Sequence, residues 1–169
     1  VWTVAKAVAK IGETTYTSLA DAFAAAQAGD TITLLADVTA SEIIIINKAI
    51  TLDGNGKTLT STAGRAINVS GADGVTIKNL TINCSGERAI NIIQNATNVT
   101  IDNVTATAAN YTVNVASSAP NAIVAIKNST LNGLCTVNVA AAGAQVTVDN
   151  STVNRSEEHT SELQSPGSI

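Results

Sequence analysis

The sequence repeats itself about every two dozen residues. A phrase of the type Ala-Ile-Asn-Val recurs, starting at Ala66, Ala89, Thr112 and Thr136. A second phrase, of the type Val-Thr-Ile-Lys-Asn, keeps in step with it, starting at Val75, Val99, Val124 and Val146. Self-similarity at a fixed period is typical of a solenoid, in which each repeat is one coil stacked on the last. The sequence therefore predicts an all-β protein, a parallel β-helix of about five to six turns of roughly 22–25 residues each.

Stacking of equivalent strands would bring equivalent side chains together in columns. Alternation within each strand predicts that one set of these columns points inward. All members of the inward set are aliphatic: Ile67/Ile90/Val113/Val137, Val75/Val99/Val124/Val146, Ile77/Ile101/Ile126/Val148 and Ile82/Ala106/Leu131/Val153. This consistency favours parallel stacking in register around a thin aliphatic core.

Two outward columns are predicted to act as structural ladders. The first is a row of amides that we expect to hydrogen-bond from coil to coil on the exposed surface, namely Asn68, Asn91, Asn114 and Asn138. The second alternates in charge at every turn, in the order Asp53, Lys78, Asp102, Lys127, Asp149. Opposite charges attract at strand spacing and like charges repel, so this order supports the proposed register.

The chain divides into three parts by its pattern. Residues 1–30 predict an opening strand or hairpin and then a short capping helix, with Ser18 as N-cap and Asp21 three residues later. This helix is expected from Leu19 to about Gln27, with Leu19, Phe23 and Ala26 on its core face and Gly29 as its stop. Residues 31–154 form the predicted β-helix.

The last part, residues 155–169, has no aliphatic columns and contains the only histidine, His159. Residues 155–165 resemble the conceptual translation of a common sequencing adapter. On that interpretation the tail is non-native and is disordered or loosely packed, and the parent gene was cut short in an environmental or draft assembly and continued further. The alternative is a genuine polar tail. We leave His159 out of any catalytic argument.

Composition restricts the function. Only 13% of residues are charged and the net charge is −4, which argues against nucleic-acid binding. The longest aliphatic run, Ile43 to Ile46, is far too short to span a bilayer.

Cys84 and Cys135 are about two coils apart, roughly 9–10 Å at strand spacing, beyond the reach of a disulfide. We therefore expect two free, largely buried thiols, and no cofactor or metal site.

The segment Ala28-Gly29-Asp30-Thr31-Ile32 after a short helix, followed by Asn-rich turns, resembles the pectin-lyase-like right-handed parallel β-helix superfamily. The resemblance implies that the β-helix is right-handed. The opening from Val8 to Gly12 and the stretch from Leu34 to Val38 look like repeat regions of large bacterial cell-surface proteins. The resemblance covers about residues 8–154. It implies the fold and an extracellular or cell-surface location; fold-level likeness does not imply an activity.

No catalytic residue is predicted. Polysaccharide hydrolysis needs two acids a few ångströms apart, and here the carboxylates are scattered, with lysines between the stacked aspartates. The candidate ligand-binding patch is Arg65, Arg88 and Tyr111, which would hold an anionic sugar or carboxylate. The alternative is structural, with an arginine covering Tyr111 by a cation–π contact beside Glu87.

Three functions remain open. The first is a non-enzymatic structural or adhesive segment of a bacterial surface or secreted protein, with surface glycans as possible partners. The second is a carbohydrate-binding or polysaccharide-degrading β-helix whose catalytic part is missing. The third is self-association, in which chains stack end to end through an uncapped last turn. Rows of exposed Thr and Asn also resemble those of ice-binding solenoids, although Thr is simply favoured on exposed strands.

Overall fold

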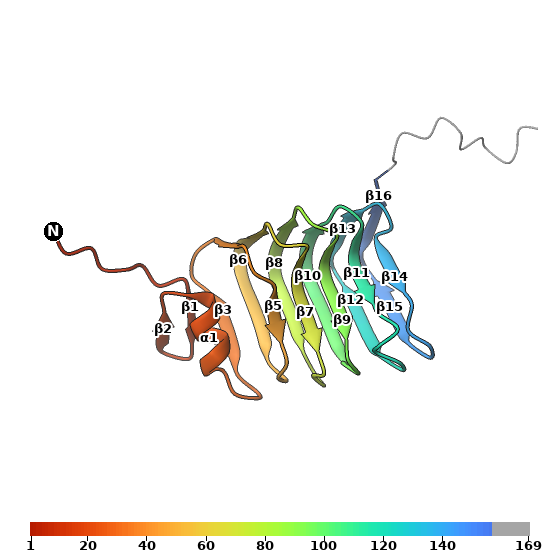
Figure 1. The fold of residues 1–169 in the computed structure, drawn as a ribbon, viewed down its shortest axis with the longest axis horizontal. Helices are drawn as coiled ribbons and strands as arrows, with labels where there is room; N and C mark the ends of the chain where they lie inside the picture. The colour runs from red at the N-terminus through yellow and green to blue at the C-terminus, as the bar shows by residue number, and fades with distance from the viewer. Residues whose placement is uncertain (157–169) are drawn as a thin grey trace, which may run out of the picture.

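The computed structural model describes residues 1–156 and shows a parallel β-solenoid of about five turns. The coils follow one another along the long axis of the molecule, with β1 and β16 at opposite ends of the stack (Figure 1). Two sheets form its walls. The eleven-stranded sheet contains β1 (Ala9–Ile11), β2 (Thr14–Tyr16), β3 (Thr31–Leu34), β4 (Val38–Ala40), β6 (Thr51–Ser61), β8 (Thr76–Cys84), β10 (Val99–Thr107), β12 (Ile123–Lys127), β13 (Thr130–Gly133), β15 (Gln145–Asp149) and β16 (Thr152–Arg155).

The second sheet has five strands and lies in front of the first in Figure 1. It consists of β5 (Ile44–Ile46), β7 (Arg65–Ser70), β9 (Arg88–Ile93), β11 (Tyr111–Val115) and β14 (Val137–Val139). All its strands pair in parallel with the equivalent strand of the next coil. Each coil therefore contributes one strand to this sheet and one long or divided strand to the other.

The predicted parallel register is confirmed. Ile101, for example, pairs with Ile77 on one side and with Ile126 on the other, and all three are buried. The remaining aliphatic columns stack in the same way. Small β-branched side chains suit this interior because the two sheets enclose only thin layers of side chains.

The long strands bend at one asparagine without leaving the sheet. In β8 the buried residues are Ile77 and then Leu80, three positions apart, with Asn79 at φ +52° between them. Asparagine adopts this left-handed conformation more readily than most residues. The bend turns the strand around a corner of the coil and brings aliphatic side chains back into the core on both sides of it.

A hairpin and a helix cover the first coil. Strand β1 pairs antiparallel with both β2 and β3, so the predicted opening hairpin is confirmed and also closes one edge of the larger sheet. Helix α1 (Leu19–Ala25) packs against this hairpin. The Ser18 hydroxyl accepts a hydrogen bond from the Asp21 backbone N–H at 3.1 Å, which confirms the predicted cap.

The predicted end of the helix was wrong by two residues. Ala26 already has φ −59° and ψ 139°, so the helix ends before Gly29. The Asp30 carboxylate accepts a hydrogen bond from the Gln27 backbone N–H at 2.7 Å and stabilises a turn there. Leu19 and Ala26 are buried, as expected, and Phe23 is half-buried against the core; Ala22, which was not assigned to this face, is also buried.

The opposite end of the solenoid is less covered. Val139, Val148 and Val153, in the last described strands, are all exposed large aliphatics. Strand β16 extends to Arg155, one residue past the predicted boundary of the β-helix. Residues 157–169, which hold most of the predicted non-native tail and His159, lie outside the described residues. Within residues 1–156, no helix is long and apolar enough to cross a membrane.

Candidate functional site

A row of asparagines runs along the corner of the larger sheet, with one residue in each of four consecutive coils. They are Asn79, Asn103, Asn128 and Asn150, with φ values of 52°, 53°, 49° and 45°. The Asn103 Nδ2 donates to Asn79 Oδ1 at 2.9 Å, and the Asn150 Nδ2 donates to Asn128 Oδ1 at 2.7 Å. The same residue type thus supplies the backbone conformation of the corner and a bond to the next coil.

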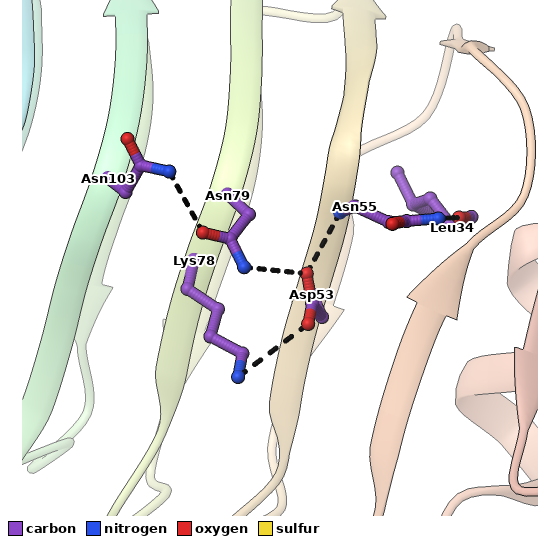
Figure 2. A network of polar contacts seen from close by, with 6 residues as sticks. All are labelled: Leu34, Asp53, Asn55, Lys78, Asn79 and Asn103. Atoms are coloured by element: carbon purple, nitrogen blue, oxygen red, sulfur yellow. Dashed lines mark hydrogen bonds and ion pairs between the residues drawn. The ribbon is translucent and has the colours of Figure 1, made fainter.

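Asp53 is the centre of the polar network at one end of this row (Figure 2). Its Oδ1 accepts hydrogen bonds from Asn79 Nδ2 at 3.1 Å and from the Asn55 backbone N–H at 2.9 Å. Its Oδ2 lies 3.6 Å from Lys78 Nζ. The carboxylate therefore has partners within the molecule on both oxygens, which is what a structural role requires.

The alternating charge column has the predicted register. Asp102 pairs with Lys78 and with Lys127, and Lys127 pairs with Asp149. Among the described residues, the contact between Lys78 and Asp53 is the one ion pair of this column within 4.0 Å. The other charges are strand neighbours without direct contact, so their contribution to stability is small.

The flat face beside the corner carries in-register threonines and asparagines. Thr81 pairs with Thr58 and Thr105, and Asn83 pairs with Thr60 and Thr107. A shallow depression of about 370 Å³ lies where this face meets the corner row, lined by Asn55, Gly56, Asn79, Leu80, Thr81, Asn103 and Thr105. Its polar lining consists of neutral amides and hydroxyls, which are both donors and acceptors of hydrogen bonds.

The predicted ladder of Asn68, Asn91, Asn114 and Asn138 lies in the five-stranded sheet. The Nδ2 groups of Asn91, Asn114 and Asn138 each donate to the asparagine Oδ1 of the preceding coil, at 3.0, 2.7 and 2.7 Å in turn. The expected exposure of this ladder was wrong, because Asn91 is only 1% exposed and Asn68 and Asn114 are also buried. In β9, four consecutive residues from Ala89 to Ile92 are buried, so both faces of this strand are covered.

The proposed ligand patch forms one column at the start of the same strands. Arg88 pairs with Arg65 on one side and with Tyr111 on the other, and all three residues are half-buried. The Arg88 guanidinium carbon lies 5.6 Å from the centre of the Tyr111 ring, and its Nη2 lies 3.8 Å from Glu87 Oε2. These are the contacts of the structural alternative. The Arg88 Nε is buried without a hydrogen-bond partner in the described part of the chain.

The two cysteines differ in their surroundings. Both are free, as expected; Cys84 is buried, and its thiol contacts the Arg88 carbonyl oxygen at 3.2 Å. Cys135 is exposed, so the expectation that both thiols are buried was wrong. It follows Gly133, at the end of β13, in the turn that leads to the next strand of the five-stranded sheet.

The polar groups described above mostly bond to one another. Within residues 1–156, no three His, Cys, Asp or Glu side chains come together in a way that would hold a metal ion. The stacked aspartates are separated by lysine, which puts neighbouring acids of that column about 9–10 Å apart. No family model matches this sequence, and no curated protein or solved structure is significantly similar to it.

Two features of the structure were not predicted from the sequence. The corner role of the asparagines was detectable, because each one follows a charged residue and precedes a new alternating segment. An apolar groove at the N-terminal end, between α1 and strands β4 and β5, had no local signal, because residues distant in the sequence form it.

Proposed function

We propose that this chain is a non-enzymatic structural and adhesive segment of a bacterial surface or secreted protein, in which the solenoid is a rigid spacer. The observation that carries this proposal is the parallel register of the coils, which shifts at one place, between Asp53 and Lys57 of β6. Aliphatic columns, amide ladders and a charge column all run from one coil to the next. The side chains that would otherwise be available for chemistry are used to join coils.

Rigidity follows from this arrangement. A coil contacts its neighbours through main-chain bonds in two sheets. From the coil of Asn68 onward, the ladders add side-chain bonds between coils at two further positions. Bending the stack would open hydrogen bonds on one side, because each bond joins adjacent coils. A spacer that holds a terminal domain away from a surface needs this stiffness.

The surface location of the proposal depends on the sequence resemblance to pectin-lyase-like repeat regions. The low charge and the Thr- and Asn-rich exterior support it, because a neutral hydrogen-bonding surface suits contact with glycans. The shallow depression beside Asn79 and Asn103 is the place on this surface where a neutral sugar would fit best. This supports a carbohydrate-binding function as the second candidate.

A glycan array separates the spacer from the adhesin. Binding that is lost in Thr81→Ala together with Thr105→Ala, and kept in Thr147→Ala on β15 as the control, supports adhesion through this face. No binding to any glycan supports a plain spacer. Release of unsaturated uronates from pectin or alginate by the purified chain would contradict the non-enzymatic proposal.

Self-association is the third candidate, favoured by the exposed valines of the last described coil. Val148 and Val153 continue buried aliphatic columns but are themselves exposed, and β15 and β16 are at the edge of the sheet. Light scattering tests this candidate. A mass that rises with concentration, and falls in Val148→Lys, supports end-to-end stacking; a monomer at all concentrations contradicts it.

A further inference from the structure

The chain contains two Asn-Gly dipeptides, Asn55-Gly56 in β6 and Asn132-Gly133 in β13. In such a dipeptide the glycine backbone nitrogen is able to attack the side-chain carbonyl carbon of the asparagine, because glycine has no Cβ to hinder the approach. Ring closure needs rotation about the asparagine backbone and side chain, so a paired strand resists it and an unpaired turn allows it. The two dipeptides therefore compare the same chemistry in two environments of one molecule.

The dipeptide Asn55-Gly56 lies in a part of β6 that the neighbouring strands do not hold. The register between β6 and β8 shifts after Asp53, and residues 54–56 have no paired residue in β8. On the other side, β3 pairs with β6 up to Asp53, and β4 pairs with it only from Leu59 onward. Both residues of the dipeptide are exposed, in the left-handed conformation typical of a tight turn, with φ values of 50° and 73°.

The side chain of Asn55 is also lightly restrained. Within the described residues, its amide makes one hydrogen bond, from Nδ2 to the Leu34 carbonyl oxygen at 3.2 Å (Figure 2). A Cβ added to Gly56 would meet no heavy atom within 4 Å, so the space around this glycine is open. Opening of a single exposed hydrogen bond therefore frees the amide to rotate toward the glycine nitrogen.

The dipeptide Asn132-Gly133 is held on both sides. Asn132 pairs with Thr107 in β10 and with Asn154 in β16. Its Nδ2 donates to Thr107 Oγ1 at 3.4 Å, and its Oδ1 accepts from Asn154 Nδ2 at 2.9 Å. Gly133 is buried, and a Cβ added there would come within 2.8 Å of the Thr112 hydroxyl oxygen. Ring closure at this site would require β13 to leave the sheet.

We propose that Asn55 is a site of spontaneous deamidation in the native protein, and that the fold protects Asn132. The Gly56 nitrogen forms a bond to Asn55 Cγ and loses its proton, while the bond between Cγ and Nδ2 breaks and ammonia leaves with that proton. Water then opens the cyclic succinimide at either carbonyl carbon, which gives aspartate or isoaspartate at position 55. Water is the co-reactant, and the reaction needs no oxidant or reductant.

Deamidation changes the shallow depression at the corner of the solenoid. Asn55 and Gly56 line one end of this depression, next to Asn79 of the following coil. The product has a carboxylate in place of the neutral amide, and this group has no N–H to donate to the Leu34 carbonyl oxygen. One end of a neutral surface thus becomes negatively charged as the protein ages. This proposal is independent of the proposed spacer or adhesive function.

Peptide mapping by mass spectrometry tests the proposal on the full chain. The protein is incubated at mildly alkaline pH, which favours removal of the glycine N–H proton, either folded or in urea. Each dipeptide reports its own conversion as the mass change from an amide to a carboxylate. We expect both sites to convert in urea, and folding to slow Asn132 several-fold more than Asn55. Equal slowing of the two sites, stronger slowing at Asn55, or conversion of neither site in the folded protein overturns the proposal.

Two variants at the exposed position 55 test the assignment by charge. Asn55→Asp has the charge of the product, so the acidic species that accumulates in the aged protein should elute with it on anion exchange. Asn55→Gln keeps an amide but lengthens the side chain, which disfavours ring closure, and should form this species several-fold more slowly. Circular dichroism verifies that both variants are folded. Formation of the acidic species at the same rate in Asn55→Gln overturns the proposal.

Discussion

Replacement of Asn91 by alanine tests whether the buried amide ladder stabilises the coils. Asn91 donates to Asn68 at 3.0 Å and accepts from Asn114 at 2.7 Å, and it is 1% exposed. Asn91→Ala removes both hydrogen bonds and leaves the Asn68 oxygen and one Asn114 N–H without partners. Each orphaned buried group costs about 1–3 kcal/mol, so we expect the free energy of unfolding to fall by about 2–6 kcal/mol.

Asn138→Ala is the matched control. Asn138 ends the described ladder and is half-buried, and its amide makes one ladder bond, to Asn114 at 2.7 Å. Its loss should lower the free energy of unfolding by only about 1 kcal/mol, because it removes one ladder bond instead of two and the Asn138 side chain is only half-buried. The same substitution is therefore predicted to have a very different effect two coils apart.

Urea unfolding followed by far-ultraviolet circular dichroism measures both values, with equal m-values required for the comparison. If Asn91→Ala and Asn138→Ala differ by less than about 0.5 kcal/mol, the ladder does not act as a buried network. Asn91→Leu, which keeps the volume but not the amide, should resemble Asn91→Ala. Full stability in Asn91→Leu would show that packing alone matters at this position.

Three further predictions concern the core, the turns and the thiols. Ile101→Ala, at a fully buried position, should lower the free energy of unfolding by about 2–5 kcal/mol in the same urea assay. A loss below about 1 kcal/mol would contradict the dry interior. Gly86→Ala should lower the melting temperature strongly, because the added Cβ would clash with the backbone of the preceding coil. Gly64→Ala should leave the melting temperature nearly unchanged, because the space around Gly64 is open. Equal effects of the two substitutions would contradict the close stacking of these turns. Cys135 should react with a thiol reagent in the native protein and Cys84 only after unfolding, so rapid modification of both without denaturant would argue against the burial of Cys84.

The register could be predicted from the sequence because similar residues recur at the same position of each repeat. Ile77, Ile101 and Ile126 occupy the same place in each repeat, and a slip by one residue would turn all of them toward water. The helix N-cap was also predictable, because the Ser18 hydroxyl accepts a hydrogen bond from the backbone N–H of Asp21, only three residues later.

Burial was harder to predict because it depends on what covers each strand. Alternation assigns Asn91 to one face and Ile90 to the other, and the sequence does not reveal that both are buried. The exposure of Cys135 was not predicted for a related reason. Cys135 lies in a turn outside the repeated phrases, where no column of equivalent residues indicates its environment. The groove beside Phe23 depends on how α1 lies against β4 and β5, and α1 is outside the repeat pattern.

The alternating charge column affects how the number of repeats can change. Lys78 and Lys127 occupy equivalent places two coils apart, with Asp102 between them. A recombination event that deleted a single repeat would keep every aliphatic column aligned but set two lysines or two aspartates side by side. Deletion or duplication of two repeats would preserve the alternation. A change by one coil would therefore add a like-charge neighbour at a small cost in stability, whereas a change by two coils would add none.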